Sequence, residues 1–199
     1  MIRVILEGEF VRLEPLTIEH LPDLDQDFEA SLFDYYPKPY PNAREFVEEN
    51  LEMQKQGTFL PFAIIHQATG KAIGCTEFSG IDEKNRKLEI GGSWIKKSFQ
   101  GSPANSEAKL LLLDHVLGKL EYVRVQFTAN ALNRQSRAGI EGIGGKFEGI
   151  LRNAMILPDG KLRDDAYYSI IAGDWLATKA MLKERVSDKA RQWAARSAF

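Results

Sequence analysis

The chain has 199 residues, of which 44% are hydrophobic, and this is enough to bury one sizeable core in a single domain. Its 26 basic and 28 acidic residues leave a net charge of −2, which argues against a nucleic-acid partner. The single cysteine, Cys75, excludes an internal disulfide and favours a reducing, cytoplasmic setting. No apolar stretch is long enough to span a membrane, and three scattered histidines predict no metal site.

The first quarter of the chain predicts one strand and two helices. Residues 10–14 alternate apolar and polar side chains, as a half-buried strand does. A helix is expected over residues 17–29, with its first residue, a threonine, as N-cap. The aromatic segment at residues 33–41 contains three prolines, which exclude a regular helix. A second helix is expected over residues 42–56, with an asparagine as N-cap and a glycine after its end.

The middle of the chain predicts a hairpin, a strand and a long helix. Apolar runs at residues 59–66 and 71–79 flank a turn at residues 68–70, which favours a β-hairpin. Residues 87–95 predict the next strand. Residues 107–120 place apolar side chains at four-residue spacing, which is typical of a helix with one buried face.

The last part of the chain predicts a strand, a helix, a hairpin and a final helix. Residues 123–128 alternate as a half-buried strand does, and residues 133–143 favour a helix. Two apolar runs at 147–157 and 162–171 flank a Pro-Asp-Gly turn. We expect a single domain over residues 1–199, with a C-terminal helical tail at about 174–199. The order of elements suggests a mixed sheet with helices on both faces.

The segment of residues 99–108 passes from a strand into a helix through small residues. Free backbone N–H groups and the positive end of a helix dipole make such a place suitable for binding phosphate groups. The alternative is an ordinary helix start, with Ser102 as N-cap and Pro103 at the first helical position. The spacing of the residues leaves both interpretations open.

Five motifs follow one another in a fixed order: Leu-Glu-Gly-Glu-Phe-Val-Arg-Leu-Glu-Pro-Leu at 6–16, Leu-Glu-Ile-Gly at 88–91, Asn-Ser-Glu-Ala-Lys at 105–109, Asn-Arg-Gln-Ser at 133–136 and Phe-Glu-Gly-Ile-Leu-Arg at 147–152. With these motifs the chain, from residue 6 to about residue 185, resembles the RimJ/RimL branch of the GNAT acetyltransferases. The resemblance implies an α/β fold of the α+β type. Its central sheet is mixed and mostly antiparallel, with a splayed parallel strand pair and helices on both faces.

The resemblance also implies an acyl-coenzyme A co-substrate, acetyl-CoA or one with a larger acyl group. In the family, a loop of pattern Gln/Arg-x-x-Gly-x-Gly/Ala holds the pyrophosphate through its amides. Gln100 matches the first position, whereas Pro103 and Asn105 stand where small residues are usual, and Pro103 lacks an N–H donor. The cofactor-binding residues implied in this way are Ile90, Gly91, Gly92, Trp94, Gln100, Gly101, Ser102, Ala104, Asn105, Ser106, Asn130 and Asn133.

Two residues are implied to be catalytic. Glu89 matches the acidic position of the family's Glu-Ile-Gly segment and would deprotonate an attacking amine; the alternative is a solvated or salt-bridged carboxylate. Many GNAT enzymes carry a tyrosine as general acid where this chain has Ile140, and Ser136 is the implied substitute that hydrogen-bonds the leaving thiolate. A serine that satisfies backbone groups at the start of the helix is the alternative. Gly91 and Gly92 are expected to form a strand bulge that turns an amide towards the thioester, or else to serve packing.

The aromatic segment at residues 33–41 is the candidate lid over the acceptor. The candidate substrate-binding residues are Phe33, Asp34, Tyr35, Tyr36 and Tyr40. Aromatic faces can hold an apolar residue or a cation, while plain anchoring of a loop is the alternative. The hairpin that carries Asp159, Arg163, Asp164 and Asp165 is expected to border the same cleft.

The sequence favours an N-acyltransferase whose acceptor is the amine of a small molecule, a peptide or a protein N-terminus. Two other classes stay open: a non-catalytic acyl-CoA-binding module, which Pro103 and the missing tyrosine favour, and an interaction protein that keeps only the fold. Coenzyme A release that depends on an added amine would distinguish the first class from the others. A homo-oligomer is possible.

Overall fold

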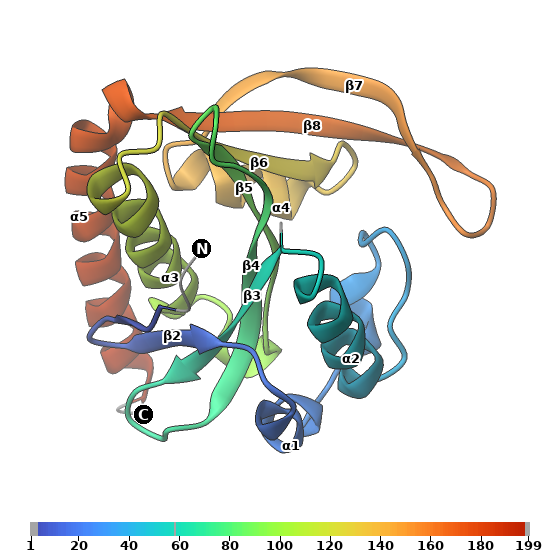
Figure 1. The fold of residues 1–199 in the computed structure, drawn as a ribbon. Coiled ribbons are helices and arrows are strands. Elements are labelled where there is room, and N and C mark those ends of the chain that lie inside the picture. Colours follow the sequence, from blue (N-terminus) through green and yellow to red (C-terminus); the bar gives the residue numbers. More distant parts are fainter. Residues whose placement is uncertain (1–3, 58, 198–199) are drawn as a thin grey trace.

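The computed structural model describes residues 4–57 and 59–197, and Figure 1 shows its fold. Within these residues, eight strands form one sheet in the order β1-β2-β3-β4-β5-β6-β8-β7. The β5–β6 pair is parallel and every other neighbouring pair is antiparallel, so the predicted mixed sheet is confirmed. The strands are β1 (Leu6–Glu7), β2 (Val11–Pro15), β3 (Leu60–His66), β4 (Ala72–Asp82), β5 (Lys87–Ile95), β6 (Arg124–Asn130), β7 (Lys146–Ile156) and β8 (Leu162–Ile171).

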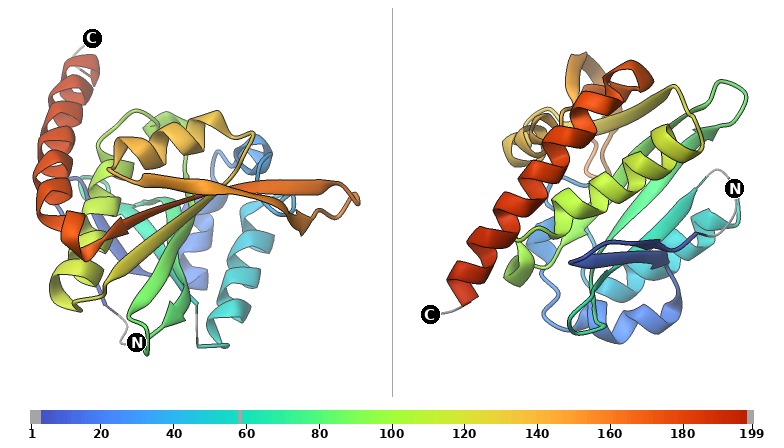
Figure 2. Two further views of the ribbon diagram at one scale, coloured as in Figure 1. Left: turned by 90° about the horizontal axis from the view of Figure 1, so that it is seen from above. Right: turned by 90° about the vertical axis from the view of Figure 1, so that its left-hand side faces the viewer.

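Helices cover both faces of the sheet, as Figures 1 and 2 show. The α-helices are α1 (Leu21–Asp25), α2 (Ala43–Gln54), α3 (Ala104–Leu113), α4 (Arg134–Gly142) and α5 (Ala172–Ser197). The larger core cluster includes side chains of α3, α4 and α5. A second cluster, on the other face, includes side chains of α1, α2 and the aromatic segment. Among the described helices, none combines the length and the apolar character that crossing a bilayer requires.

The helix expected over residues 17–29 starts as predicted, with Thr17 as N-cap, but ends early. A 3₁₀ turn, Ile18–His20, leads into α1, which ends at Asp25. Asp27 has a left-handed φ of 58°, which a continuing helix does not allow. Phe28 then stacks on Phe33 with ring centroids 5.4 Å apart. The chain leaves the helix early because Phe28 packs into the aromatic cluster, and periodicity alone does not reveal this.

The predicted cap of α2 is confirmed by its hydrogen bond, whereas α3 begins one residue later than the start at Pro103 that the helix-start interpretation predicts, with Pro103 itself in the N-cap position. The Asn42 side chain accepts a bond of 2.9 Å from the amide of Glu45 at the start of α2. The Ser102 hydroxyl accepts one of 3.2 Å from the amide of Ala104, and Pro103 between them already has helical angles. α3 therefore begins three residues earlier than the expected start at residue 107. At its other end it continues into a π-helical turn, Asp114–Lys119.

A single carboxylate joins the N-terminal hairpin to the first turn of α3. Glu107 is 5% exposed and accepts hydrogen bonds of 2.9, 2.8 and 2.6 Å from the amides of Glu9, Phe10 and Val11. The Cβ of an alanine at Gly8 would lie 2.5 Å from the Glu107 carboxyl carbon, so glycine is needed there. This carboxylate therefore fixes where β1 and β2 lie relative to α3.

We expect Glu107→Ala to lower the free energy of unfolding by about 3 kcal/mol, because three backbone donors would lose a charged acceptor. Glu107→Gln, which keeps an acceptor oxygen, should cost less. Urea unfolding of the three proteins, followed by circular dichroism, measures both differences. Equal stability of the alanine variant and the unsubstituted protein would show that the three bonds contribute nothing.

Candidate functional site

The parallel strands β5 and β6 pair over only three residues each. Lys87, Leu88 and Glu89 lie opposite Arg124, Val125 and Gln126, and no further pair joins the two strands within the described chain. β6 nevertheless continues, paired with β8, as far as Asn130. The expected splayed strand pair is therefore confirmed, and it leaves backbone edges of β5 and β6 without a strand partner.

A bulge interrupts β5 where it leaves β6. Glu77 of β4 lies opposite Gly91, whereas Cys75 lies opposite Trp94, so β5 carries an extra residue between these two pairs. Gly92 has a φ of 52°, which favours glycine. Cys75 is 1% exposed, and burial raises the pKa of its thiol. The predicted bulge at Gly91 and Gly92 is thus present.

A buried lysine holds the bulge from the α3 side of the sheet. Lys109 of α3 is 5% exposed, and its ammonium donates to the hydroxyls of Thr76, at 2.9 Å, and Ser93. The Ser93 hydroxyl donates to the carbonyl of Gly91 at 2.9 Å. Because the peptide is trans, the N–H of Gly92 points the opposite way from this carbonyl, away from Lys109. Burial lowers the pKa of Lys109 to about 7.

A carboxylate covers the bulge from the other side. The side chain of Glu77 fills the space next to the glycine pair: a Cβ on Gly91 would lie 3.1 Å from its Oε1, and one on Gly92 would overlap with it. Burial, and then the nearby charge of Glu89, raise the pKa of Glu77 to about 7, while Lys109 acts in the opposite direction. Glu77 is therefore a titratable group beside the gap between β5 and β6.

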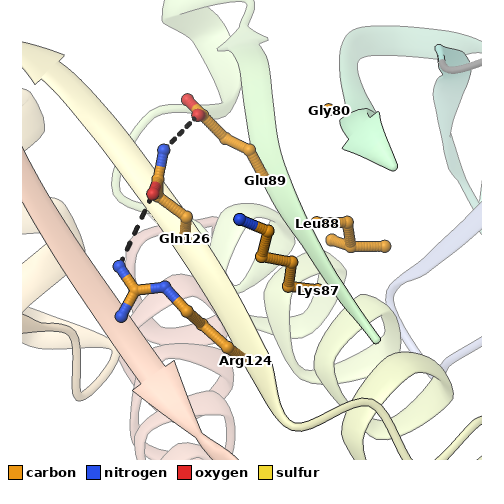
Figure 3. Close-up of a pocket in the computed structure, with 6 residues that line it drawn as sticks. All are labelled: Gly80, Lys87, Leu88, Glu89, Arg124 and Gln126. Atoms are coloured by element: carbon orange, nitrogen blue, oxygen red, sulfur yellow. Dashed lines mark hydrogen bonds between the residues drawn. The ribbon is translucent and has the colours of Figure 1, made fainter. Parts of the chain in front are cut away.

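Glu89 is held differently, in a chain of hydrogen bonds across the sheet. Its carboxylate accepts a bond of 2.9 Å from the Gln126 amide, and Arg124 on the same strand forms two bonds with Glu148 of β7, at 2.7 and 2.5 Å. Figure 3 shows Glu89, Gln126 and Arg124 in line beside a pocket, which Gly80, Lys87 and Leu88 complete. Ser169 of β8 also donates to Glu148, at 2.6 Å. The predicted catalytic residue Glu89 is thus fixed by Gln126.

Polar side chains of four strands gather on this side of the sheet, which we call the polar face: Glu77, Glu89, Gln126, Thr128 and Tyr167. The register places Glu89 opposite Gln126, and Thr128 opposite Tyr167. The Thr128 hydroxyl is buried without a hydrogen-bond partner in the described part of the chain. Since Thr128 lies beyond the last β5–β6 pair, its unused hydroxyl belongs to the splayed part.

The aromatic segment contributes both core and surface. The rings of Phe33 and Tyr40 are 2% and 7% exposed and pack with α2 and Trp94, which is itself 5% exposed, so these rings anchor the segment. Asp34 and Tyr35 are exposed. The Tyr36 hydroxyl and the Trp94 indole nitrogen are buried without a partner among the described residues.

Burial raises the pKa of the Tyr36 hydroxyl, and the charges of Glu77 and Cys75 raise it further. The β7–β8 hairpin reaches the same segment: Arg163, 8% exposed, donates to the Tyr35 carbonyl at 2.9 Å and to Asp165 at 2.6 Å. The hairpin therefore contacts the aromatic segment, while the expectation that it borders the acceptor cleft stays a prediction. The lid role of the segment stays a prediction.

The segment before α3 presents several unused amides. Gly101 has a φ of 82°, and no hydrogen bond joins its amide, or those of Asn105 and Ser106, to another described residue. Pro103 has no N–H and stands at the N-cap, one position before the predicted one, and the amide of Ala104 is occupied by the Ser102 hydroxyl. The Gln100 side chain is 3.5 Å from the carbonyl of Ile95. The side chain of Ile90 lies in the core, which leaves only its backbone for a ligand.

The residues predicted on and before α4 lie beyond the free end of β6. The Asn130 side chain accepts from the amide of Leu132, and that of Asn133 accepts from the amide of Ser136, both at 2.9 Å. Both asparagines are therefore occupied locally, in a turn and a helix cap. The Ser136 hydroxyl forms no hydrogen bond with another described residue, so it does not satisfy the backbone of α4.

Glu77 and Lys109 are the site residues that the sequence analysis missed. Each is the charged residue in an otherwise uncharged run, residues 72–81 for Glu77 and 108–113 for Lys109, and this is the signal that could have found them. Within residues 4–57 and 59–197, no group of histidine, cysteine, aspartate and glutamate side chains is placed to hold a metal ion.

Comparison with known proteins agrees with this arrangement. The family model described as "Acetyltransferase (GNAT) domain" matches residues 11–146, more than half of the chain. A GCN5-related N-acetyltransferase from Brucella melitensis has a similar structure, with a TM-score of 0.86 and 32% identity; the match covers 94% of this chain and 86% of that one. An uncharacterized N-acetyltransferase p20 from Bacillus licheniformis is 26% identical over 67% of this chain and 74% of its own length.

The RimJ/RimL resemblance extends to the fold. RimL, a ribosomal L7/L12 alpha-N-protein acetyltransferase, aligns with a TM-score of 0.72 and 22% identity, over 86% of this chain and 96% of that one. At this identity the match concerns the fold alone. With the family match over residues 11–146 and the splayed β5–β6 pair, the chain belongs to the GNAT acetyltransferase family.

Proposed function

We propose that the chain transfers an acyl group, acetyl or larger, from coenzyme A to a primary amine of a protein, a peptide or a small molecule. The observation that carries this proposal is the end of β5–β6 pairing after Glu89 and Gln126. The free strand edges can pair with the amide groups of a pantetheine arm. The chain also offers the unused hydroxyl of Thr128 in the splayed part and the free amides of Gly101, Asn105 and Ser106, which suit a pantetheine and a pyrophosphate.

The bound thioester supplies an activated acyl carbon and a thiolate leaving group. An amine must be neutral to attack it, and alkyl ammonium groups have pKa values near 10, so a base helps at pH 7. We assign this role to Glu77, because its pKa of about 7 suits proton abstraction near neutral pH. Glu89 would assist by raising the pKa of Glu77.

Two further groups of the chain have roles in this proposal. The N–H of Gly92 would donate to the oxygen of the attacked carbonyl, and Lys109 would keep that peptide in place through Thr76 and Ser93. The free hydroxyl of Ser136 would hydrogen-bond the departing thiolate. It would thus take the role of the tyrosine that many GNAT enzymes have at the position of Ile140.

The proposed acceptor is a cationic amine, because the polar face offers it two neighbouring carboxylates, Glu77 and Glu89, and the tyrosine Tyr167, while the aromatic segment adds Tyr36. The RimL protein acts on a protein N-terminus, and a peptide α-amine is accordingly one acceptor to test. The exposed Asp34 and Tyr35 would meet the rest of the acceptor.

We expect coenzyme A release from acetyl-CoA or another acyl-CoA only when a suitable amine is added. A thiol-release screen of N-terminal peptides, lysine peptides and small amines against several acyl donors measures this. Thermal stabilisation by acetyl-CoA without turnover of any amine would instead indicate a binding module. If acetyl-CoA gives no turnover with any amine and no thermal stabilisation, the proposal is contradicted.

We expect kcat/KM to fall about tenfold per pH unit below pH 7, because protonated Glu77 accepts no proton. Glu77→Gln should lower kcat/KM at pH 7.5 by about 100-fold and flatten this limb of the profile. Glu89→Gln should move the midpoint to lower pH, because the charge of Glu89 raises the pKa of Glu77. If the pH dependence of kcat/KM is unchanged in Glu77→Gln but disappears in Glu89→Gln, Glu89 is the base.

We expect Ser136→Ala to lower kcat by about tenfold or more with little change in the KM for the donor, because the hydroxyl acts on charge that develops during the reaction. Steady-state kinetics with one acceptor measure the split. Ser136→Thr, which keeps a hydroxyl, is the matched control. Unchanged turnover in the alanine variant would remove Ser136 from the mechanism.

A further inference from the structure

Three basic side chains share one face of α5. Arg185, Lys189 and Arg196 are separated by four and seven residues, spacings that return to the same side of a helix. Burial and then the like charges of Arg185 and Arg196 lower the pKa of Lys189, which lies between the two arginines along the helix. We call the three side chains the α5 basic face.

The α5 basic face has no carboxylate partner among the described residues, although other cations of the same helix do. Lys179 pairs with Asp114 and Arg191 pairs with Asp188. The Nε of Arg185 is buried without a hydrogen-bond partner in the same part of the chain. A buried donor and a set of like charges both destabilise a fold unless an anion joins them. The unpaired state of this face is therefore a sign of a missing ligand.

The face connects the segment before α3 with the end of α4. A Cβ on Gly101 would lie 3.3 Å from a terminal nitrogen of Arg196, and one on Gly142 would lie 3.0 Å from a terminal nitrogen of Arg185. Figure 2 shows α5 running beside α3, with α4 near one part of its length and the segment before α3 near another. Trp193 of α5 stacks on Phe99 with ring centroids 6.2 Å apart, which holds the helix against that segment.

The donor site needs positive charge at this place. The segment before α3 offers the amides of Gly101, Asn105 and Ser106, but Pro103 has no N–H and Ser102 occupies that of Ala104. Glu107 adds a negative charge to the first turn of the same helix. Amides alone would therefore balance little of the charge of a pyrophosphate and a 3′-phosphate, whereas guanidinium and ammonium groups form strong bonds with phosphate.

We propose that Arg185, Lys189 and Arg196 bind the phosphate groups of the acyl donor, so that α5 forms one wall of the donor site. This inference rests on the proposed use of acyl-coenzyme A. It assigns a ligand-binding role to a helix that lies outside residues 11–146, the part that the family model matches. Arg196, beside Gly101, would meet the pyrophosphate, and Arg185 and Lys189 the phosphate further along.

Isothermal titration calorimetry with coenzyme A, 3′-dephospho-coenzyme A and pantetheine tests the proposal. We expect Arg185→Gln, Lys189→Gln and Arg196→Gln each to weaken coenzyme A binding by about tenfold, and to leave pantetheine binding unchanged. Adenosine 3′,5′-bisphosphate, which lacks the pantetheine, should lose affinity in the same variants. Lys183→Gln is the matched control, because Lys183 is exposed and lies on the opposite side of α5.

Thermal unfolding without ligand separates binding from folding. Relief of repulsion should leave Lys189→Gln at least as stable as the unsubstituted protein, and coenzyme A should then raise its Tm by less. Coenzyme A affinity that is equal in all variants would overturn this inference while leaving the proposed reaction in place. No binding of coenzyme A to the unsubstituted protein would overturn both.

Discussion

The gap between β5 and β6 depends on a bulge that must be held in place. A strand that carries an extra residue bends away from its neighbour, and here the bend comes directly after the last β5–β6 pair. Gly92 gives the backbone the necessary angle. Lys109 holds the Gly91 carbonyl from one side of the sheet through two hydroxyls. Polar contacts thus hold the local shape of the site.

The same bulge is bordered by two ionisable groups whose burial favours their neutral forms. Lys109 on one side of the sheet and Glu77 on the other both have pKa values of about 7, for the shared reason that burial disfavours their charged forms. The charge of each group favours the charged form of the other, which opposes part of the effect of burial. Near neutral pH the bulge therefore lies between two groups that can each gain or lose a proton.

The sequence predicted the fold well because its signals were local. Helix caps such as Asn42, turn glycines and strand alternation act over a few residues, and they placed nearly every element. The failure at residues 17–29 came from Phe28, whose packing partner Phe33 lies in a different element. Glu77, Lys109 and the α5 basic face were missed for a similar reason. Their environment is created by strands and helices that meet only in the folded chain, whereas the predictions for Gly91, Gly92 and Ser136 came from family motifs.

The burial of Cys75 has a practical consequence. Attack on a disulfide or an alkylating reagent requires an accessible thiolate, and Cys75 is 1% exposed with a raised thiol pKa. It is also the sole sulfhydryl group of the chain. A chromogenic disulfide reagent added to the folded protein should therefore react with thiols set free in solution and leave the polypeptide intact. Continuous colorimetric assays can thus be run at high protein concentration with a low background.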